Sequence, residues 1–266
     1  MKKTFGFIGC GNMGGALAKA VSEAGYKNDI LLSDINKERV NSLAEEISAE
    51  PSDVHTIAKE CKYIFIGVKP QMIAECFGSI AADLNSRADK PIIVSMAAGV
   101  AVSRITELSM IDSVIRIMPN MPVSVGSGVV LATSAGVSEE LKSEFENAMS
   151  KAGVFDWIEE KFIDAASAVS GCGPAFAYMF AQALSDGAVA CGLPRDKATL
   201  YAAGTLLGSA KMILESGKHP EKLKDEVCSP GGSTIMGVKS LEDEGMRSAA
   251  INAVIAAYER TKELGK

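Results

Sequence analysis

The chain has few of the residues that most often carry acid–base and metal chemistry. Among its 266 residues only two are histidines, His55 and His219, and neither lies beside a glycine-rich segment. The six cysteines are far apart, with no Cys-x-x-Cys pair and no histidine at metal-ligand spacing. These shortages argue against a metal site and against a Ser-His-Asp hydrolase. We expect the cysteines to be reduced thiols, most of them buried.

Positive charge and long apolar runs are also scarce. The formal net charge of −6 provides no basic field for a nucleic acid, and no Lys or Arg cluster marks a membrane surface. Residues 165–185 carry no charge, but a Gly-Cys-Gly-Pro sequence interrupts them, so we predict a buried helix rather than a membrane span. The first residues lead directly into a strand pattern without a secretory signal. We therefore expect a cytoplasmic protein whose partners are small molecules and copies of itself.

The first 162 residues alternate between strand and helix patterns. Short apolar runs bounded by breakers, typical of buried parallel strands, occur at 3–8, 30–33, 63–67 and 91–95. Further strands are predicted at 113–118, 126–133 and 154–157, with a helix at about 138–152 before the last. This order predicts an α/β fold, a Rossmann-type doubly wound and mostly parallel sheet.

From about residue 162 onward only helical patterns remain. Thirteen alanines fall between Ala165 and Ala210, and such small residues let helices approach closely. These helices are apolar on several sides, and a domain of about one hundred residues cannot cover all of that apolar surface. We therefore predict an α/β domain at 1–162 and, at 163–266, an all-α domain that completes its core against a second copy of the chain.

A glycine-rich turn follows the first strand. Gly9, Gly11 and Gly14 have Rossmann spacing, a helix follows, and Asp34 lies twenty residues beyond the third glycine. This context predicts binding of NADH or NADPH. Asp34 should accept a hydrogen bond from the adenosine ribose and disfavour a 2′-phosphate, which leans the choice toward NADH. The choice stays open because nearby residues are suited to a phosphate: Asn36, Lys37 and Arg39.

Loops at the carboxyl ends of later strands should reach the same cofactor, at 67–70, 95–99 and 118–122. The alternative for each loop is ordinary turn chemistry, and for Lys69 a solvated surface position. The predicted cofactor-binding residues are Gly9, Cys10, Gly11, Asn12, Met13, Gly14, Ser33, Asp34, Val68, Lys69, Pro70, Ala97, Ala98, Gly99 and Asn120.

The sequence Cys-Ser-Pro-Gly-Gly-Ser-Thr-Ile-Met-Gly at residues 228–237, here called the cradle, indicates a second site. Ser229 and Pro230 end the preceding element, two glycines permit close approach, and Ser233 and Thr234 can cap a new helix. Bare N–H groups at a helix N-terminus suit a small carboxylate or phosphate. An ordinary helix cap is the alternative interpretation.

Several motifs together resemble pyrroline-5-carboxylate reductase, the last enzyme of proline biosynthesis, and the resemblance spans the whole chain. The matching segments are FIGCGNMG at 7–14, VKP at 68–70, MAAGV at 96–100, RIMPNMP at 116–122, GCGPAF at 171–176 and, most specifically, residues 223–242 around the cradle. The resemblance implies a Rossmann domain followed by a helical domain that interlocks in a homodimer, with larger rings of dimers in some members.

The resemblance also implies a reaction. NADH or NADPH delivers hydride to the C=N carbon of 1-pyrroline-5-carboxylate, a cyclic imine with one carboxylate, and L-proline is the product. Thr234 is the predicted catalytic residue, hydrogen-bonded to the ring nitrogen. No metal is implied. The predicted substrate-binding residues are Ser229, Gly231, Gly232, Ser233 and Thr234.

Two other functions are open to the same fold. The first is a β-hydroxyacid dehydrogenase, which shares the two-domain plan. Enzymes of that kind have a catalytic lysine on the first long C-terminal helix, whereas residues 171–186 of this chain contain no lysine. A nucleotide-sensing regulatory subunit would use the first glycine-rich turn but would have no use for the cradle.

Overall fold

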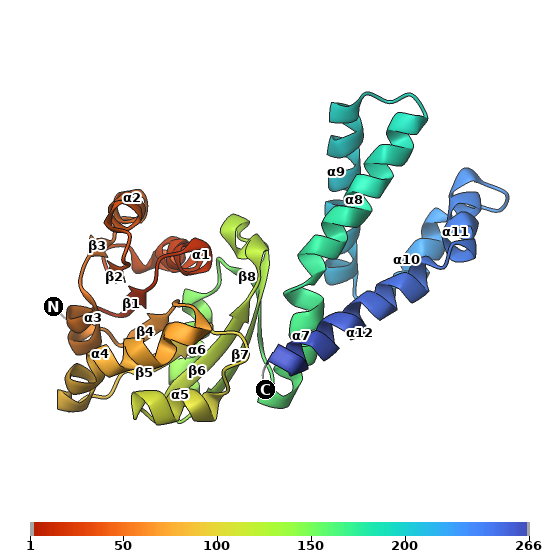
Figure 1. Cartoon of the computed structure of the whole chain (residues 1–266). Helices are drawn as coiled ribbons and strands as arrows, with labels where there is room; N and C mark the ends of the chain where they lie inside the picture. The colour runs from red at the N-terminus through yellow and green to blue at the C-terminus, as the bar shows by residue number, and fades with distance from the viewer. Residues whose placement is uncertain (1–2, 265–266) are drawn as a thin grey trace. The chain divides into compact units, whose positions relative to one another are not determined.

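The computed structural model describes residues 3–264 (Figure 1). Its sheet has the strand order β3-β2-β1-β4-β5-β6-β7-β8. Only β6 and β7 pair antiparallel, so the predicted α/β, mostly parallel architecture is confirmed. The sequence prediction missed β3, which is two residues long and ends in proline. The strands are β1 Phe5–Ile8, β2 Ile30–Ser33, β3 Glu50–Pro51, β4 Tyr63–Ile66, β5 Ile92–Ser95, β6 Val114–Pro119, β7 Gly128–Ala135 and β8 Gly153–Trp157.

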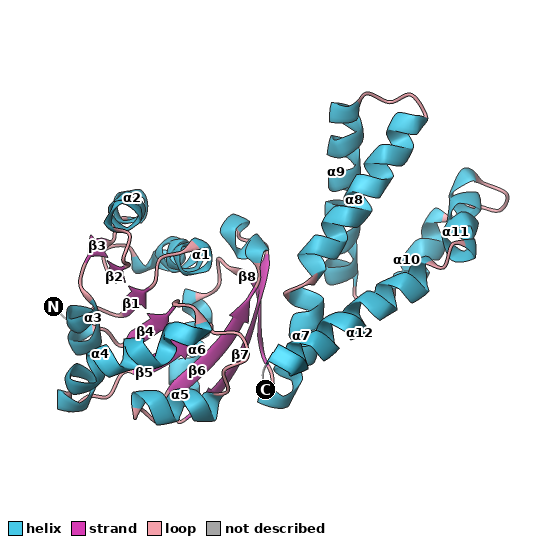
Figure 2. Cartoon of the chain, in the orientation of Figure 1, coloured by secondary structure: helices cyan, strands magenta, loops and turns pink. Residues whose placement is uncertain are grey.

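Alternate strand residues point to opposite faces of the sheet, and both faces are covered by helices (Figure 2). Phe7 and Phe65 stack on one face with ring centroids 4.2 Å apart, while Ile8 and Ile66 lie in the core of the other face. Burial on both faces explains why the central strands β1, β2, β4 and β5 are apolar at most positions. The first face is covered by α1 Asn12–Val21, α2 Lys37–Ile47 and α6 Glu139–Ala148, and the second by α3 Val54–Glu60, α4 Ile73–Ser86 and α5 Val102–Ser109.

Short helical turns join these elements. A π-helical turn, η1 Ser22–Tyr26, follows α1, and Gly25 within it adopts a φ of +110° that redirects the chain toward β2. The remaining turns are of the 3-10 type: η2 Pro70–Met72, η3 Met121–Val125 and η4 Glu160–Phe162.

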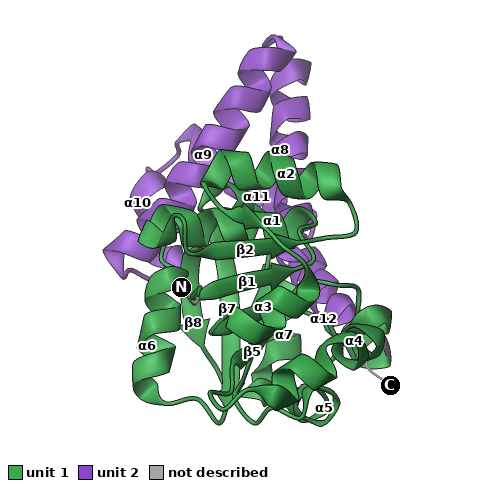
Figure 3. Cartoon of the chain, turned by 90° about the vertical axis from the view of Figure 1, so that its left-hand side faces the viewer, with its two compact units in different colours: residues 1–171, 258–266 green, residues 172–257 purple. Residues whose placement is uncertain are grey.

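The chain forms two compact units (Figure 3). The first extends to Gly171 and includes the end of α12 from Tyr258, and the second is Cys172–Ala257. The division falls after α7, later than the change of pattern at residue 162, because α7 packs against β6 and β7 and fully buries Ile163 and Ala168. The remaining helices are α7 Ile163–Ser170, α8 Gly173–Ala190, α9 Arg195–Ser216, α10 Pro220–Val227, α11 Ser233–Asp243 and α12 Met246–Leu264.

The second unit leaves much of its apolar surface uncovered. Helices α8 and α9 lie side by side, yet Tyr178, Met179 and Leu207 are 64%, 73% and 70% exposed. The prediction of a buried helix at 165–185 is therefore wrong for α8 in the single chain. In a pair of packed helices each helix covers only one side of the other. Because α8 and α9 are apolar on several sides, apolar side chains stay exposed.

Cysteine burial also differs from the prediction. All six thiols are free, but only Cys10 and Cys61 are buried, and Cys191 is exposed beyond the end of α8. The expectation that most cysteines are buried is wrong, because Cys76, Cys172 and Cys228 lie at the margins of the packed regions and are only half-buried. Within residues 3–264, no helix is long and apolar enough to cross a membrane.

Candidate functional site

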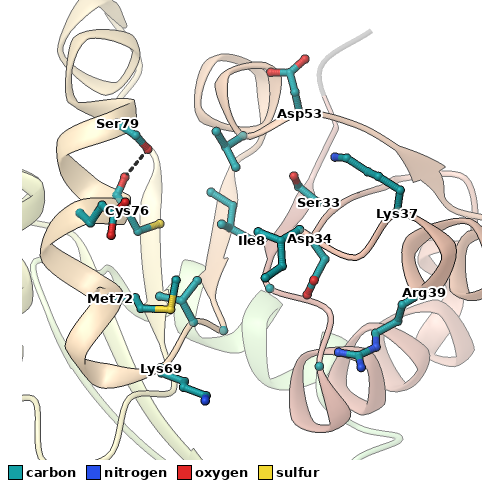
Figure 4. A pocket seen from close by; sticks show the side chains of 17 residues that line it. Ile8, Ser33, Asp34, Lys37, Arg39, Asp53, Lys69, Met72, Cys76 and Ser79 are labelled. Atoms are coloured by element: carbon teal, nitrogen blue, oxygen red, sulfur yellow. Dashed lines mark hydrogen bonds between the residues drawn. The ribbon is translucent and has the colours of Figure 1, made fainter.

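A pocket of about 740 Å³ lies outside the carboxyl ends of β1, β2 and β4 (Figure 4). In doubly wound sheets this edge is where ligands bind, and the volume is within the usual range for a small-molecule site. The segments after the three strands line it, together with the start of α3 and one side of α4. They contribute Ile8, Gly9, Gly11, Ser33, Asp34, Ile35, Lys37, Arg39, Asp53, Val54, Gly67, Val68, Lys69, Met72, Glu75, Cys76 and Ser79.

Each glycine of the first turn meets a different steric demand. Gly9 has a φ of +99°, and a Cβ atom there would lie 2.7 Å from the carbonyl of Gly67. A Cβ on Gly14 would overlap the carbonyl oxygen of Gly9, so Gly14 lets α1 pack on the end of β1. Gly11 differs, because its Cβ would point into open space, with the Nη1 of Arg39 nearest at 3.9 Å. This open space is where a ligand would approach the backbone.

Gly11 is also the N-cap of α1. Glycine has no side chain to cap the helix, and the first turn of α1 contains no acidic residue. The first N–H groups and the positive end of the helix dipole therefore face the pocket without an acidic side chain from the helix itself. This geometry fits a phosphate of a dinucleotide.

Asp34 connects the glycine-rich turn to the segment before α2. Its Oδ2 accepts a hydrogen bond from the Cys10 N–H at 2.7 Å, and its Oδ1 accepts one from the Asn36 N–H at 2.9 Å. Each carboxylate oxygen can accept a second bond, so the group can still bind a ribose hydroxyl. Asp34 therefore holds the shape of the turn, a role that the sequence did not indicate.

The charges around the pocket are balanced by sign. The acidic side chains of Asp34, Asp53 and Glu75 are matched by the basic side chains of Lys37, Arg39 and Lys69. Hydrogen bonds from the N–H and hydroxyl of Thr56 lower the pKa of Asp53, which keeps that carboxyl ionised. The pocket thus offers cations for phosphates and carboxylates for sugar hydroxyls.

The thiols at the pocket are not suited to nucleophilic chemistry. Burial raises the pKa of Cys76 to about 11 and that of Cys10 to about 12, so both are protonated at neutral pH. Among residues 3–264, no group of three or more His, Cys, Asp or Glu side chains is arranged to hold a metal ion.

Two other predicted cofactor loops lie at the same edge of the sheet. The loop after β5 contains Ala97, which is buried, and Ala98 and Gly99, which are exposed, with a φ of +74° at Gly99. Asn120, after β6, is buried: its Nδ2 donates to the Ser170 carbonyl and its Oδ1 accepts from Val129 N–H, both at 2.8 Å. Its side chain ties α7 to β7 and does not line the pocket, so a direct cofactor contact would have to come from its backbone.

The cradle lies in the second unit, between α10 and α11. Gly231 has a φ of +70°, and a Cβ on Gly232 would overlap the Oγ of Ser229. The turn therefore favours glycine at Gly231, and Gly232 leaves room for the Ser229 hydroxyl, which lies folded against the turn. The turn closes with a 3.0 Å hydrogen bond from Gly232 N–H to the Ser229 carbonyl.

The hydroxyls of the cradle are not used as helix caps. Gly232 is the N-cap of α11, whereas Ser233 and Thr234 are its first two residues, with no side-chain capping bond. The prediction that these two residues cap the helix is therefore wrong, because the glycine takes the N-cap position. The helix N-terminus has no acidic residue in its first turn, and both hydroxyls are exposed beside it. The arrangement suits a small anion with a second polar group.

Comparisons with known proteins agree over the whole length of the chain. Residues 160–264 match the family described as pyrroline-5-carboxylate reductase dimerisation, and residues 4–99 match NADP oxidoreductase coenzyme F420-dependent. Pyrroline-5-carboxylate reductase 3 of Danio rerio is 38% identical over 264 residues, covering 98% of this chain and 91% of that protein. The chain belongs to the pyrroline-5-carboxylate reductase family.

Solved structures of pyrroline-5-carboxylate reductases share the fold. The enzyme from Coxiella burnetii aligns with a TM-score of 0.92 at 29% identity, covering 100% of both chains. The Plasmodium falciparum enzyme, solved with NADP bound, aligns with a TM-score of 0.83 at 30% identity, covering 99% of this chain and 98% of that one. These matches confirm the resemblance found in the sequence and the expectation of an NAD(P)H-dependent oxidoreductase.

For this member of the pyrroline-5-carboxylate reductase family, the sequence located many but not all of the pocket residues. Of the predicted set, Gly9, Gly11, Ser33, Asp34, Val68 and Lys69 line the pocket. Cys10 and Asn12 lie with Gly11 on a smaller groove between α1 and α2, while Met13 and Gly14 are inside α1 and Pro70 starts η2. The sequence missed Ile8, Ile35, Asp53, Val54, Met72, Glu75, Cys76 and Ser79. Four of these residues, Val54, Glu75, Cys76 and Ser79, lie on α3 and α4, where no motif marks them.

Proposed function

We propose that the chain reduces 1-pyrroline-5-carboxylate to L-proline with NADH or NADPH, the final step of proline biosynthesis. Full-length membership of the reductase family carries this proposal. The two candidate sites support it, because one suits a dinucleotide and the other a small carboxylate. Residues 171–186 contain no lysine, so the catalytic group of a β-hydroxyacid dehydrogenase is absent. A nucleotide sensor would have no use for the cradle.

The glycine-rich turn and α1 would hold the pyrophosphate of the cofactor. Gly11 leaves room for it, and the helix N-terminus supplies N–H donors. Bound NADH or NADPH supplies the hydride for the imine carbon. We assign the adenosine ribose to Asp34 and, when the ribose carries a 2′-phosphate, that phosphate to Lys37 and Arg39, whose side chains line the same pocket.

The cradle would bind the substrate. We assign the carboxylate to Ser229, Ser233 and the N–H groups around Gly231 and Gly232, at the positive end of the α11 dipole. Thr234 would hydrogen-bond the ring nitrogen. The nitrogen arrives protonated or receives its proton through this hydroxyl and water, so no histidine or carboxylate pair is required. Most of the rate enhancement then comes from holding the imine carbon against the hydride donor.

We further propose a homodimer formed through the second unit. Its apolar side chains on α8 and α9, among them Tyr178, Met179 and Leu207, need cover that the single chain does not provide. On this view residues 1–162 form the dinucleotide-binding domain and 163–266 the substrate-binding and dimerisation domain. A ring of dimers, as in some members of the family, would appear in light scattering as a multiple of the dimer mass.

A cytoplasmic location is part of the same proposal. The six cysteines are free thiols, and Cys191 is exposed in the single chain. Free thiols are typical of proteins in a reducing compartment.

The test is a spectrophotometric assay of the purified full chain. We expect pyrroline-5-carboxylate to cause loss of the absorbance of NADH and NADPH, with L-proline as the product. A panel of β-hydroxyacids with NAD⁺ and NADP⁺ serves as the comparison. Turnover of a β-hydroxyacid without imine reduction would replace the proposal by the dehydrogenase, and nucleotide binding without any turnover would replace it by the sensor.

A further inference from the structure

Arg116 carries a buried positive charge near the carboxyl edge of the sheet. It is 4% exposed on β6 and pairs in register with Ser95, the last residue of β5. Its Nη1 lies 2.9 Å from Glu160 Oε1, and its Nη2 lies 3.7 Å from an oxygen of Asp164. A guanidinium this deeply buried needs a close carboxylate, and Glu160 provides the closer one.

The same Glu160 oxygen has a second partner. It accepts a 2.8 Å hydrogen bond from the N–H of Val102, the first residue of α5. Ala101 is the N-cap of this helix and has no capping side chain, and the first turn contains no acidic residue. Glu160, 58 residues away in sequence, therefore caps α5 and supplies the negative charge that a helix N-terminus favours.

The segment between β5 and α5, residues 96–101, depends on this cap. Three N–H groups of the segment make long hydrogen bonds: Ala97 N–H to Ser95 Oγ and Val100 N–H to the Ala97 carbonyl at 3.4 Å, and Met96 N–H to the Ile66 carbonyl at 3.5 Å. The 2.8 Å bond that the Val102 N–H donates to Glu160, just after the segment, is shorter than these three. The position of the exposed Ala98 and Gly99 is thus fixed mainly from the two ends of the segment.

We propose that Glu160 is a positioning residue that holds residues 96–101 against the nicotinamide half of the cofactor. This inference rests on the proposed function, in which the adenosine half lies beside Asp34 at the end of β2. The other half must then extend along the carboxyl edge past β4 toward β5, because the two halves of a dinucleotide lie on opposite sides of the switch point. Glu160 does not touch the cofactor. It acts through the N–H of Val102 and through Arg116.

The test compares two ligands that differ only in the nicotinamide ring. Binding of NADH and of ADP-ribose to the full chain is measured by calorimetry, for the wild type and Glu160→Gln. Gln removes the charge that holds both Arg116 and the start of α5, so we expect the Kd for NADH to rise about ten-fold. The Kd for ADP-ribose should change less than about two-fold. Glu159→Gln is the matched control, because Glu159 is exposed and pairs only with Lys161 at the surface.

A second variant guards against simple unfolding, since Glu160→Gln leaves a buried charge without its closer partner. Arg116→Met combined with Glu160→Ala removes both charges and still leaves the Val102 N–H without its acceptor. We expect this variant to fold and to show the same selective loss of NADH binding. Faster hydrogen exchange at the first turn of α5 should accompany the loss in both variants.

The outcomes separate the inference from the function on which it rests. If the wild type binds NADH more tightly than ADP-ribose and both variants keep that difference, the positioning role of Glu160 is wrong and the proposed function stands. If the wild type binds the two ligands equally, residues 96–101 do not contact the nicotinamide, and the assignment of Ala97, Ala98 and Gly99 to the cofactor fails with the inference.

Discussion

Replacement of Asp34 by Ser should shift cofactor preference toward NADPH. In the wild-type chain Asp34 has two roles that can be separated by comparing cofactors. It accepts hydrogen bonds from the Cys10 and Asn36 N–H groups, and we assign it the adenosine ribose. The first role shapes the glycine-rich turn and is common to both cofactors. The second favours NADH and opposes a 2′-phosphate.

The magnitude follows from the bonds that are lost. A hydrogen bond to a charged group contributes roughly 1.5–3 kcal/mol. Loss of the Cys10 N–H bond lowers kcat/KM for both cofactors, and loss of the ribose bond lowers it for NADH alone. With NADPH, removal of the carboxylate also relieves its repulsion of the phosphate. The ratio of kcat/KM for NADPH to that for NADH should therefore rise about ten- to a hundred-fold, while both values fall in absolute terms.

Steady-state kinetics with each cofactor at saturating pyrroline-5-carboxylate measures this ratio. Glu75→Gln is the matched control, because Glu75 lines the same pocket from α4 without contacting the turn, and its ratio should move little. An equal fall for NADH and NADPH in Asp34→Ser would refute the reasoning. Asp34 would then act only on the shape of the turn, and the ribose would be bound elsewhere.

Three further predictions concern the cradle, assembly and pH. Ser229→Ala should chiefly raise the KM for pyrroline-5-carboxylate, since the carboxylate charge is constant through the reaction, whereas Thr234→Val should also lower kcat by about ten- to a hundred-fold; steady-state kinetics that leave both constants of Thr234→Val at wild-type values would make the threonine purely structural. Light scattering of the full chain should give a dimer or a multiple of it, and Tyr178→Glu should reduce that mass; a wild-type monomer with full activity would contradict the dimer. Burial raises the pKa of Cys10 and of Cys61 from 9.0 to about 12, so above pH 9 these thiols ionise in the unfolded chain but stay protonated in the folded one. Their contribution to the free energy of unfolding is therefore complete below pH 9 and is lost as the pH rises toward 12. Urea unfolding at pH 8 and pH 10 should show a loss of about 1.4 kcal/mol per thiol, and a Cys10→Ala variant that loses as much as the wild type would exclude this cause.

Local physical rules made much of the first unit predictable. A strand buried on both faces is apolar at most positions, so 30–33 and 63–67 were recognisable without knowledge of their neighbours. Gly14 is required by its contact with the Gly9 carbonyl in the same turn, and Gly9 by the positive φ of that turn, so both were predictable from the local motif. The carbonyl that faces Gly9 belongs to the distant Gly67 and was not predictable in this way. The cradle was also recognisable from a local pattern, because its two glycines belong to a turn formed by adjacent residues.

Contacts between distant segments were not predictable, because no local pattern marks them. The sequence suggested a ribose ligand at Asp34, but its bond to Cys10 depends on the approach of the ends of β1 and β2. Asn120 was expected at the cofactor, yet the packing of α7 against the sheet directs its amide to Ser170. Glu160 reads as one of several surface acids, and only the sheet places Arg116 and the start of α5 within reach of one carboxylate oxygen. The sequence alone determined the elements, the glycine-rich turn, the cradle and the family, because each depends on neighbouring residues. The tertiary structure decided which side chains line the pocket and which hold other residues in place, because that depends on groups that only folding brings together.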